Sequence, residues 1–284
     1  MIVMRTLKIL APIFTLGICS SCGKTEDPVG CKFKSGYSEY ALVWQDEFEG
    51  TEIDLSKWSF DLGNGCQLDS ALCGWGNNEL QWYTQRPENA TVENGNLVIT
   101  AIRESPPYLN EHAYTSSRMV TKNKGDWKYG RIDVRAKIPT GQGIWSAIWM
   151  LPTENVYGIW PKSGEIDIME NIGSEPDEIL GTIHYGHDFW RFNSQKLELE
   201  SGFYHDNFHV YSVLWTDVCI QFLMDDKEVG IPNTRTTVLP TTYPFDQLFH
   251  VILNIAVGGN LPGSPNGSTP FPQTLEVDYV RVYQ

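Results

Sequence analysis

Positive charge is scarce in this 284-residue sequence, which has 21 Lys and Arg residues against 35 Asp and Glu residues and a formal net charge of -14. An acidic surface repels phosphate backbones, and the sequence has no run of Lys or Arg to offset that repulsion. We therefore expect no nucleic-acid partner. Beyond the N-terminal region, no apolar run approaches the roughly 20 residues that a membrane-spanning helix needs. Any contact with a membrane should therefore come from the N-terminus.

The N-terminus has the composition of an export signal. Arg5 and Lys8 precede the apolar run Ile9–Ile18, which is too short to span a membrane as a mature helix. Small residues precede Cys22 in a pattern that resembles the lipobox of bacterial lipoproteins, in which the cysteine is lipidated. We therefore expect a signal peptide over residues 1–21, a tether over 22–38 and one domain over 39–284, anchored by lipid at the outer membrane or cell surface. An ordinary secretory signal, which would give a secreted protein, is the alternative.

Cysteine is also sparse, with six residues in the whole chain. No CxxC pair follows Cys22, which argues against a structural zinc site among the remaining cysteines. Exported proteins meet oxidising conditions, in which disulfides persist. Cys66 and Cys73 flank a short loop, so we expect a local bridge between them. The pairing of Cys31 and Cys219 stays open.

Helical periodicity is nearly missing, and short segments of strand character fill the chain instead. In Gly130–Ile138 apolar residues alternate with charged ones, which is the pattern of a strand with one buried and one wet face. Only Asn77–Tyr83 has a spacing that suggests a helical turn. Many short strands without helices between them indicate an all-β fold, an antiparallel β-sandwich or jelly roll. The strands we expect are Asn96–Ile102, Gly130–Ile138, Glu165–Ile172, Glu178–Tyr185, His209–Trp215, Val218–Met224, His250–Ile255 and Leu275–Tyr283.

Three acids stand inside one of these apolar segments. Glu165 and Asp167 are two residues apart, so on a strand their side chains share a face. Strict alternation would send Glu170 to the opposite face. One extra residue, a β-bulge at Ile168-Met169, would return it to the face of the other two.

Three carboxyls so close together cannot all ionise freely, so at least one pKa should be raised. An ionised carboxylate beside a protonated carboxylic acid is the pair that cleavage of a glycosidic bond requires. In retaining enzymes the two carboxyl groups are about 5–5.5 Å apart, and one of them is the nucleophile. A solvated acidic strand face is the alternative interpretation.

Aromatic residues are abundant, with 10 Trp, 13 Tyr and 12 Phe, and some stand close to the acids. Trp145 and Trp149 are four residues apart in an expected strand, so they should face the same side, and Trp160 precedes Glu165 by five residues. Indole rings stack on the apolar faces of sugar rings, which predicts a saccharide cleft here. Core packing is the alternative for Trp149.

Several ordered blocks of the sequence are similar to glycoside hydrolase family 16, and in particular to its laminarinase-like endo-β-1,3-glucanases. The resemblance covers nearly all of residues 40–284, and the blocks are highly specific when taken together. They are Trp44–Phe48, Trp75–Thr84, Tyr129–Pro139, Gly164–Gly173, Leu253–Gly259 and Val277–Tyr283. The resemblance implies a concanavalin A-like β-jelly-roll of two curved sheets with a concave substrate cleft. It also implies a retaining endo-β-1,3-glucanase that hydrolyses laminarin-like β-1,3-glucan by double displacement, without a catalytic cofactor, and we expect a monomer.

The resemblance assigns roles to individual residues. Glu165 would be the nucleophile, Asp167 its helper and Glu170 the general acid/base. A surface ion pair is the alternative for Arg118. His184 would hydrogen-bond a sugar or Glu170, or else be a satisfied core histidine. The positions that match the family's substrate cleft are Asn77, Arg118, Trp145, Trp149, Trp160 and His184.

The resemblance further implies a structural Ca²⁺ far from the cleft. The matching positions are Glu47, Gly95 and Asp278, which would supply carboxylate or carbonyl oxygens, the ligands that Ca²⁺ prefers. Asp278 is also a carboxylate in an otherwise apolar terminal segment. A surface acid is the alternative.

Departures from the family pattern leave other functions open. Leu261 stands where an aromatic residue is common, and the loop between Cys66 and Cys73 is a local insertion near Asn77. The alternatives within enzymes are a mixed-linkage β-1,3-1,4-glucanase and another family 16 polysaccharide hydrolase. From a different class, the protein would be a non-catalytic β-glucan-binding lipoprotein.

Overall fold

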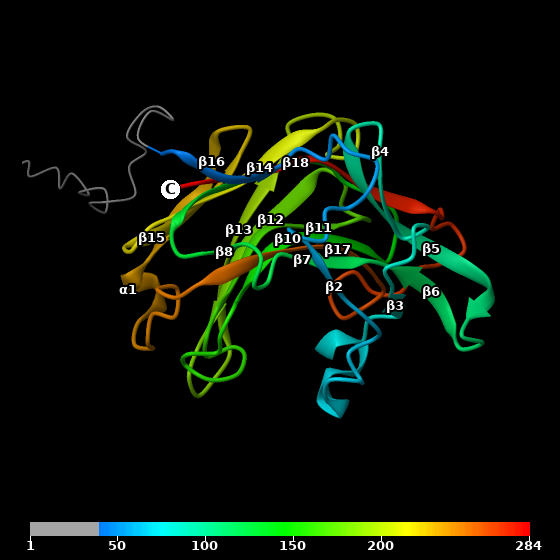
Figure 1. The fold of residues 1–284 in the computed structure, drawn as a ribbon. Helices are drawn as coiled ribbons and strands as arrows, with labels where there is room; N and C mark the ends of the chain where they lie inside the picture. The colour runs from blue at the N-terminus through cyan, green and yellow to red at the C-terminus, as the bar shows by residue number, and fades with distance from the viewer. Residues whose placement is uncertain (1–39) are drawn as a thin grey trace, which may run out of the picture.

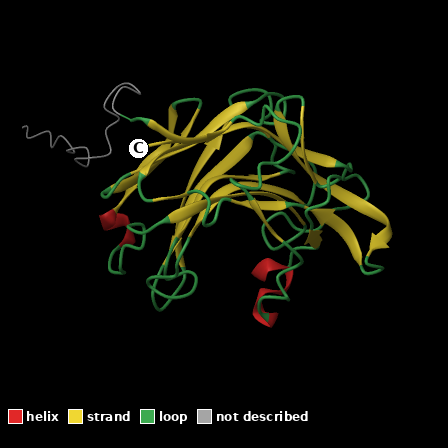
Figure 2. Ribbon diagram, viewed as in Figure 1, coloured by secondary structure: helices red, strands yellow, loops and turns green. Residues whose placement is uncertain are grey.

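The computed structural model describes residues 40–284, which form two stacked β-sheets that arch together (Figures 1 and 2). We call them the outer and the inner sheet. Within these residues the outer sheet has the order β16 (Lys227–Thr234), β15 (Cys219–Met224), β14 (His209–Trp215), β9 (Gly130–Lys137), β18 (Gln273–Tyr283), β5 (Asn96–Tyr108), β6 (His112–Ser116), β3 (Gln81–Tyr83), while β1 (Leu42–Asp46) pairs with β18 and β4 (Ala90–Glu93) with β5. The inner sheet has the order β13 (Arg191–Glu198), β12 (Glu178–Tyr185), β11 (Glu165–Ile172), β10 (Ile144–Pro152), β17 (Phe249–Val257), β7 (Arg118–Val120), β2 (Ser59–Asp61), with β8 (Asp126–Trp127) on β17.

The all-β sandwich expected from the sequence is confirmed. Neighbouring strands are antiparallel, except that β3 runs parallel to β6. Helical structure in the described part is limited to the 3-10 segment η2 (Ser70–Gly76) and the single turn α1 (Arg235–Val238). No helix among residues 40–284 is long and apolar enough to cross a membrane.

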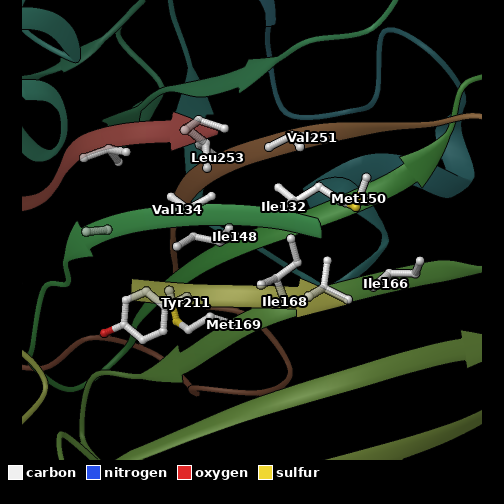
Figure 3. Close-up of a cluster of buried hydrophobic side chains, with 14 of the residues drawn as sticks. Ile132, Val134, Ile148, Met150, Ile166, Ile168, Met169, Tyr211, Val251 and Leu253 are labelled. Carbon is white, nitrogen blue, oxygen red and sulfur yellow. The ribbon is translucent and has the colours of Figure 1, made fainter. Parts of the chain in front are cut away.

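The core lies between the two sheets. Ile132 and Val134 of β9 in the outer sheet pack in one cluster with Ile148 of β10 and Leu253 of β17 in the inner sheet (Figure 3). All four side chains are fully buried. Burial of apolar area at about 25 cal/mol per Å² is the main stabilising contribution to such a sandwich.

The sequence predicted that the charged face of β9 is exposed to solvent, but in the structure its first two charged residues are buried. Arg131 and Asp133 are only 2% exposed, and Arg131 Nε lies 2.5 Å from Asp133 Oδ1. The reason is position in the sheet, since β9 runs between β14 and β18, and Arg131 contacts Ser212 of β14 and Asp226 as well as Asp133. Pairing of the two charges offsets the cost of their burial.

The expected helical turn at Asn77–Tyr83 is wrong. The helical residues are those just before it, Ser70–Gly76, and they begin after Asp69, whose side chain accepts a hydrogen bond from the backbone of Ala71. Residues Gln81–Tyr83 form β3, which is held by pairing with β6 and not by local spacing.

A disulfide joins Cys66 and Cys73 and closes the loop that leads into η2. The expected lipidation site Cys22, the signal peptide over 1–21, the tether over 22–38 and Cys31 all lie outside the described residues.

Candidate active site

The three acids of β11 share one face because the strand contains a bulge. Asp167 pairs with Thr182 of β12, but Glu170 pairs with Leu180, so one extra residue of β11 lies between the two pairs. Ile168 and Met169 both turn into the core, at 3% and 0% exposure. The predicted bulge at Ile168-Met169 is therefore confirmed, and it returns Glu170 to the cleft side.

The turn before β11 brings Glu165 into position. Gly164 has φ +82, and a Cβ added there would lie 2.9 Å from the ring of Phe245, so neither the conformation nor the space suits another residue. Glu165 follows directly and keeps partial contact with solvent, whereas Asp167 and Glu170 are 2% and 9% exposed.

Each of the two glutamates receives a hydrogen bond from an indole. Trp160 Nε1 donates to Glu165 Oε2 over 2.6 Å, and Trp145 Nε1 donates to Glu170 Oε1 over 3.1 Å. Hydrogen bonds from N–H groups favour the ionised form of a carboxyl. The tryptophans expected to line a sugar cleft therefore also hold the carboxyls.

His184 lies opposite Glu165 on β12. Its Nε2 is 3.1 Å from Asp167 Oδ2, and its Nδ1 accepts a hydrogen bond from Trp190 Nε1 over 2.9 Å. The sequence-based hypothesis offered a sugar or Glu170 as the partner of His184, and the structure places its Nε2 beside Asp167 instead. The side chain is also not part of the core, because it borders the site.

Burial raises the pKa of all three carboxyls. The pKa of Glu165 rises to about 8 through desolvation and the charge of Asp167, and that of Glu170 rises to about 7, chiefly through desolvation. Desolvation and the charge of Glu170 raise the pKa of Asp167 well above its usual range. At neutral pH the triplet thus retains protons and can present a carboxylate beside a carboxylic acid, the pair needed for acid-assisted displacement.

Arg118 of β7 lies on the opposite side of the cleft, where its guanidinium is held between two indoles. Its Cζ is 4.4 Å from the ring centroid of Trp75 and 4.7 Å from that of Trp149. It does form an ion pair, with Asp61 at 3.0 Å, but it is only 8% exposed and lines the cavity of the acids. The alternative interpretation, a surface ion pair, is therefore wrong, because the ion pair lies in the cavity wall and not on the surface.

Side chains not predicted individually complete the cavity wall. Glu79 accepts a hydrogen bond from Gln81 over 2.6 Å and a longer one from Asn77 over 3.4 Å, and burial raises its pKa. The signal for Glu79 was present, because it stands in the Trp75–Thr84 block. The cavity is lined by Trp75, Asn77, Glu79, Tyr83, Arg118, Trp145, Ala147, Trp149, Glu165, Asp167, Glu170, Asn254 and Ala256.

Asn254 of β17 links two parts of this wall. It accepts a hydrogen bond from Trp149 Nε1 over 2.7 Å and donates one to the Tyr83 hydroxyl over 3.0 Å. Trp149 is thereby oriented by a polar partner and presents its ring to the cavity. Core packing, the alternative for Trp149, does not describe this position.

Two groups of residues can be considered as metal ligands. Glu165, Asp167 and His184 offer ligand atoms within 4.8 Å of one another, but the two carboxyls belong to the acid triplet and hydrogen-bond each other. The second group is the expected calcium set, far from the acids in the outer sheet. There Arg281 donates two hydrogen bonds of 2.8 Å to Glu47, and Arg135 lies 2.5 Å from Asp278.

The strand registers bring the expected calcium residues to one gap. β5 pairs with residues 273–277 of β18 and β1 with residues 280–283, while β9 occupies the other edge. Glu47 follows the end of β1 and Gly95 precedes β5, so both lie at the gap opposite Asp278. Two carboxylates and nearby carbonyls are hard oxygen donors, a set that fits Ca²⁺.

Comparisons with known proteins agree with this architecture. The model of glycosyl hydrolases family 16 matches residues 76–281. The glucan endo-1,3-beta-glucosidase A1 of Niallia circulans is 44% identical over 262 residues, covering 86% of this chain and 38% of that protein. The beta-glucanase of Rhodothermus marinus is 44% identical over 258 residues, covering 86% of this chain and 85% of that protein. The crystal structure of the laminarinase catalytic domain from Thermotoga maritima has a TM-score of 0.78 at 39% identity, covering 86% of this chain and 98% of that one.

Proposed function

This chain belongs to glycosyl hydrolases family 16, and from that premise we propose that it is a retaining endo-β-1,3-glucanase of the laminarinase type. The observation that carries the proposal is the acid triplet on the cleft face of the bulged strand β11. Glu165 and Glu170 flank Asp167 there, and each glutamate has its own indole donor. A non-catalytic acidic surface has no need of buried carboxyls with raised pKa values.

Glu165 is the nucleophile of the proposed reaction. Its carboxylate attacks the anomeric carbon and forms a covalent glycosyl-enzyme while the bond to the leaving sugar breaks. Because its pKa is raised to about 8, only a fraction of Glu165 is ionised at neutral pH, and the N–H of Trp160 favours that attacking form. Asp167 hydrogen-bonds Glu165 and shares protons within the triplet.

Glu170 is the general acid and then the general base. Its raised pKa keeps the carboxyl protonated below about pH 7, so it can deliver a proton to the leaving oxygen. Once ionised, it takes a proton from the water that attacks the glycosyl-enzyme. The second displacement restores the original anomeric configuration and both carboxyls.

The aromatic lining favours a polysaccharide as the substrate. Trp145 and Trp149 present rings to the cavity, and Trp160 is 49% exposed beside Glu165. Such rings stack on the apolar faces of pyranoses. The named relatives include a glucan endo-1,3-beta-glucosidase and a laminarinase, which makes β-1,3-glucan the substrate proposed here.

The test is product analysis on laminarin beside barley-type mixed-linkage glucan. We expect laminarin to be cut internally into short oligosaccharides, with Glu165→Ala lowering turnover by at least about a thousandfold. Ordinary turnover by Glu165→Ala would overturn the assigned mechanism. Faster cleavage of the mixed-linkage glucan would favour the broader beta-glucanase activity named for the Rhodothermus relative. Binding of laminarin without release of reducing ends would instead indicate a glucan-binding protein.

We also propose a structural Ca²⁺ at the gap formed by Glu47, Gly95 and Asp278. The strand registers and the oxygen donors support it, and Arg281 and Arg135, which pair with the carboxylates, would move aside for the ion. A bound Ca²⁺ would tie together β1, β5 and β18. Its role would be to stabilise the outer sheet, because the acids that perform the reaction are on the inner sheet.

The proposed location is the bacterial outer membrane or cell surface, with the protein held by lipid on Cys22 and otherwise monomeric. The support is the N-terminal sequence alone. Fractionation of the wild type and Cys22→Ala tests it, since only the wild type should sediment with membranes. Equal release of both proteins to the soluble fraction would leave an ordinary secretory signal as the explanation. Analytical ultracentrifugation of residues 39–284 measures the oligomeric state, for which we expect a monomer.

A further inference from the structure

Trp190 lies in the loop between β12 and β13, where the acid site meets solvent. Its side chain is 55% exposed, but its one polar atom is engaged, since Nε1 donates to His184 Nδ1 over 2.9 Å. The two rings are 5.7 Å apart with an interplanar angle of 20°. An exposed tryptophan thus uses its only donor on a histidine of the site.

This bond determines which nitrogen of His184 carries the proton. A ring nitrogen that accepts a hydrogen bond has its lone pair free, so Nδ1 is unprotonated. The proton of the neutral ring is then on Nε2, which lies 3.1 Å from Asp167 Oδ2. Protonation of His184 on Nδ1 would break the bond from Trp190.

We propose that Trp190 is a positioning residue of the acid site, which holds His184 neutral with its protonated Nε2 lying 3.1 Å from Asp167 Oδ2. The inference rests on the proposed function, because the reaction needs a protonated Glu170. It adds an outer link to the site, from Trp190 through His184 and Asp167 to the nucleophile Glu165.

The charge of His184 affects the acids of β11, which face its ring. A positive charge on His184 lowers the pKa of both Glu165 and Glu170. A neutral ring therefore preserves Glu170 as an acid over a wider pH range. The tryptophan achieves this without adding a charge of its own.

The other neighbours of His184 supply no competing charge. On β13 the residue paired with it is Phe192, and Trp160 lies 6.2 Å away between ring centroids. In the loop, His187 and Asp188 pair with each other at 2.8 Å. Arg191 is exposed and pairs in register with Tyr185, one residue further along β12. The charged groups that face the imidazole are thus the three acids of β11.

Trp190 could instead act only as a platform for a sugar ring, because it stacks on Phe192 at 5.4 Å and is half exposed. Trp190→Phe separates the two roles, since phenylalanine keeps an aromatic ring and loses the donor. For a positioning role we expect kcat on laminarin to fall about tenfold while KM stays within about twofold. The alkaline limb of the pH profile of kcat/KM should also move to lower pH.

His187→Gln is the matched control, because it removes the other histidine of the same loop and leaves the Trp190 bond intact. Its pH profile should match that of the wild type. A rise in KM for Trp190→Phe with an unmoved alkaline limb would overturn the positioning role and leave the platform. A thermal melt of each variant establishes that it is folded.

Nitrogen NMR of the ¹⁵N-histidine-labelled wild-type domain gives a second readout that does not depend on turnover. We expect His184 Nδ1 to have the shift of an unprotonated acceptor and Nε2 that of a protonated nitrogen, with the signals assigned by their loss in His184→Gln. A proton on Nδ1 in the wild type would overturn the inference. Failure of the wild type to cut any β-glucan would overturn the proposed function instead, and the tautomer would still be measured.

Discussion

The indole Nε1 of Trp160 donates to Glu165 Oε2 over 2.6 Å, while 49% of the Trp160 side chain remains exposed. One residue thus offers its ring to a sugar and its N–H to the proposed nucleophile. Since this hydrogen bond favours the carboxylate, it offsets part of the effect of burial on Glu165. Trp145 has the corresponding relationship with Glu170.

Trp160→Phe should therefore raise the pKa of Glu165 and move the acid limb of the kcat/KM profile to higher pH. We expect kcat to fall about tenfold, because the nucleophile is ionised less often and is held less firmly. Trp145→Phe is the matched variant, and it should move the alkaline limb to higher pH because the acid Glu170 then keeps its proton longer. Steady-state kinetics on laminarin measures both. A shift of the same limb in both variants would contradict the assigned roles.

The wild-type activity should fall on the alkaline side of its pH optimum, where Glu170 loses its proton. The proposed acid Glu170 has a pKa raised to about 7, so it is protonated below that pH and loses its proton above it. In Glu170→Gln this limb should disappear, and a glucoside with an activated aryl leaving group should still be attacked by Glu165 because no proton is needed for its departure. An alkaline limb that persists in Glu170→Gln would assign the titration to another group.

Glu165→Gln should stabilise the fold at neutral pH while it abolishes turnover. The folded-state pKa of Glu165 is about 8, above the 4.5 of an ordinary glutamate, so the folded state holds a proton that the unfolded state releases. Stability is therefore lost as the pH rises from about 4.5 toward 8, and the glutamine variant avoids that loss. We expect a gain of up to about 4 kcal/mol in the free energy of unfolding at pH 8, vanishing near pH 4. Urea unfolding at the two pH values measures it, and an equal gain at both would refute the electrostatic cause.

Most of the local architecture could be predicted from the sequence, because it follows from side-chain alternation. The residues of β11 and β12 coincide with the segments expected from that pattern. The bulge was predictable too, since three acids among isoleucines have one arrangement that keeps all of them out of the core. What alternation could not predict was the burial of Arg131 and Asp133, because that depends on the neighbouring strands.

The polar links of the site were harder to predict, because they join residues from different strands and loops. His184 could be placed near the acids, but its contact with Asp167 depends on the register between β11 and β12. Trp190 gave no signal, since a tryptophan in a loop has no periodicity that reveals its hydrogen-bond partner. Arg118 was expected in the cleft from family resemblance alone, and its place between Trp75 and Trp149 depends on the packing of distant segments.

Calcium should raise the melting temperature without changing the chemistry. If Ca²⁺ binds Glu47, Gly95 and Asp278 in the folded state only, an ion concentration of about 100 times Kd adds roughly 2.7 kcal/mol to the free energy of unfolding. For a domain of this size that corresponds to a rise of about 5 °C or more over the protein in EDTA. Differential scanning calorimetry with and without Ca²⁺ measures the shift.

Asp278→Asn should remove most of this calcium-dependent shift, because it takes away one of the two carboxylates at the gap. Asp188→Asn, at an exposed acid of the loop between β12 and β13, should keep the full shift and serves as the control. In EDTA the wild type should retain its kcat on laminarin well below the melting temperature, since the ion is remote from Glu165 and Glu170. A calcium shift of equal size in Asp278→Asn would place the ion elsewhere, and a loss of kcat in EDTA at that temperature would contradict a purely structural role.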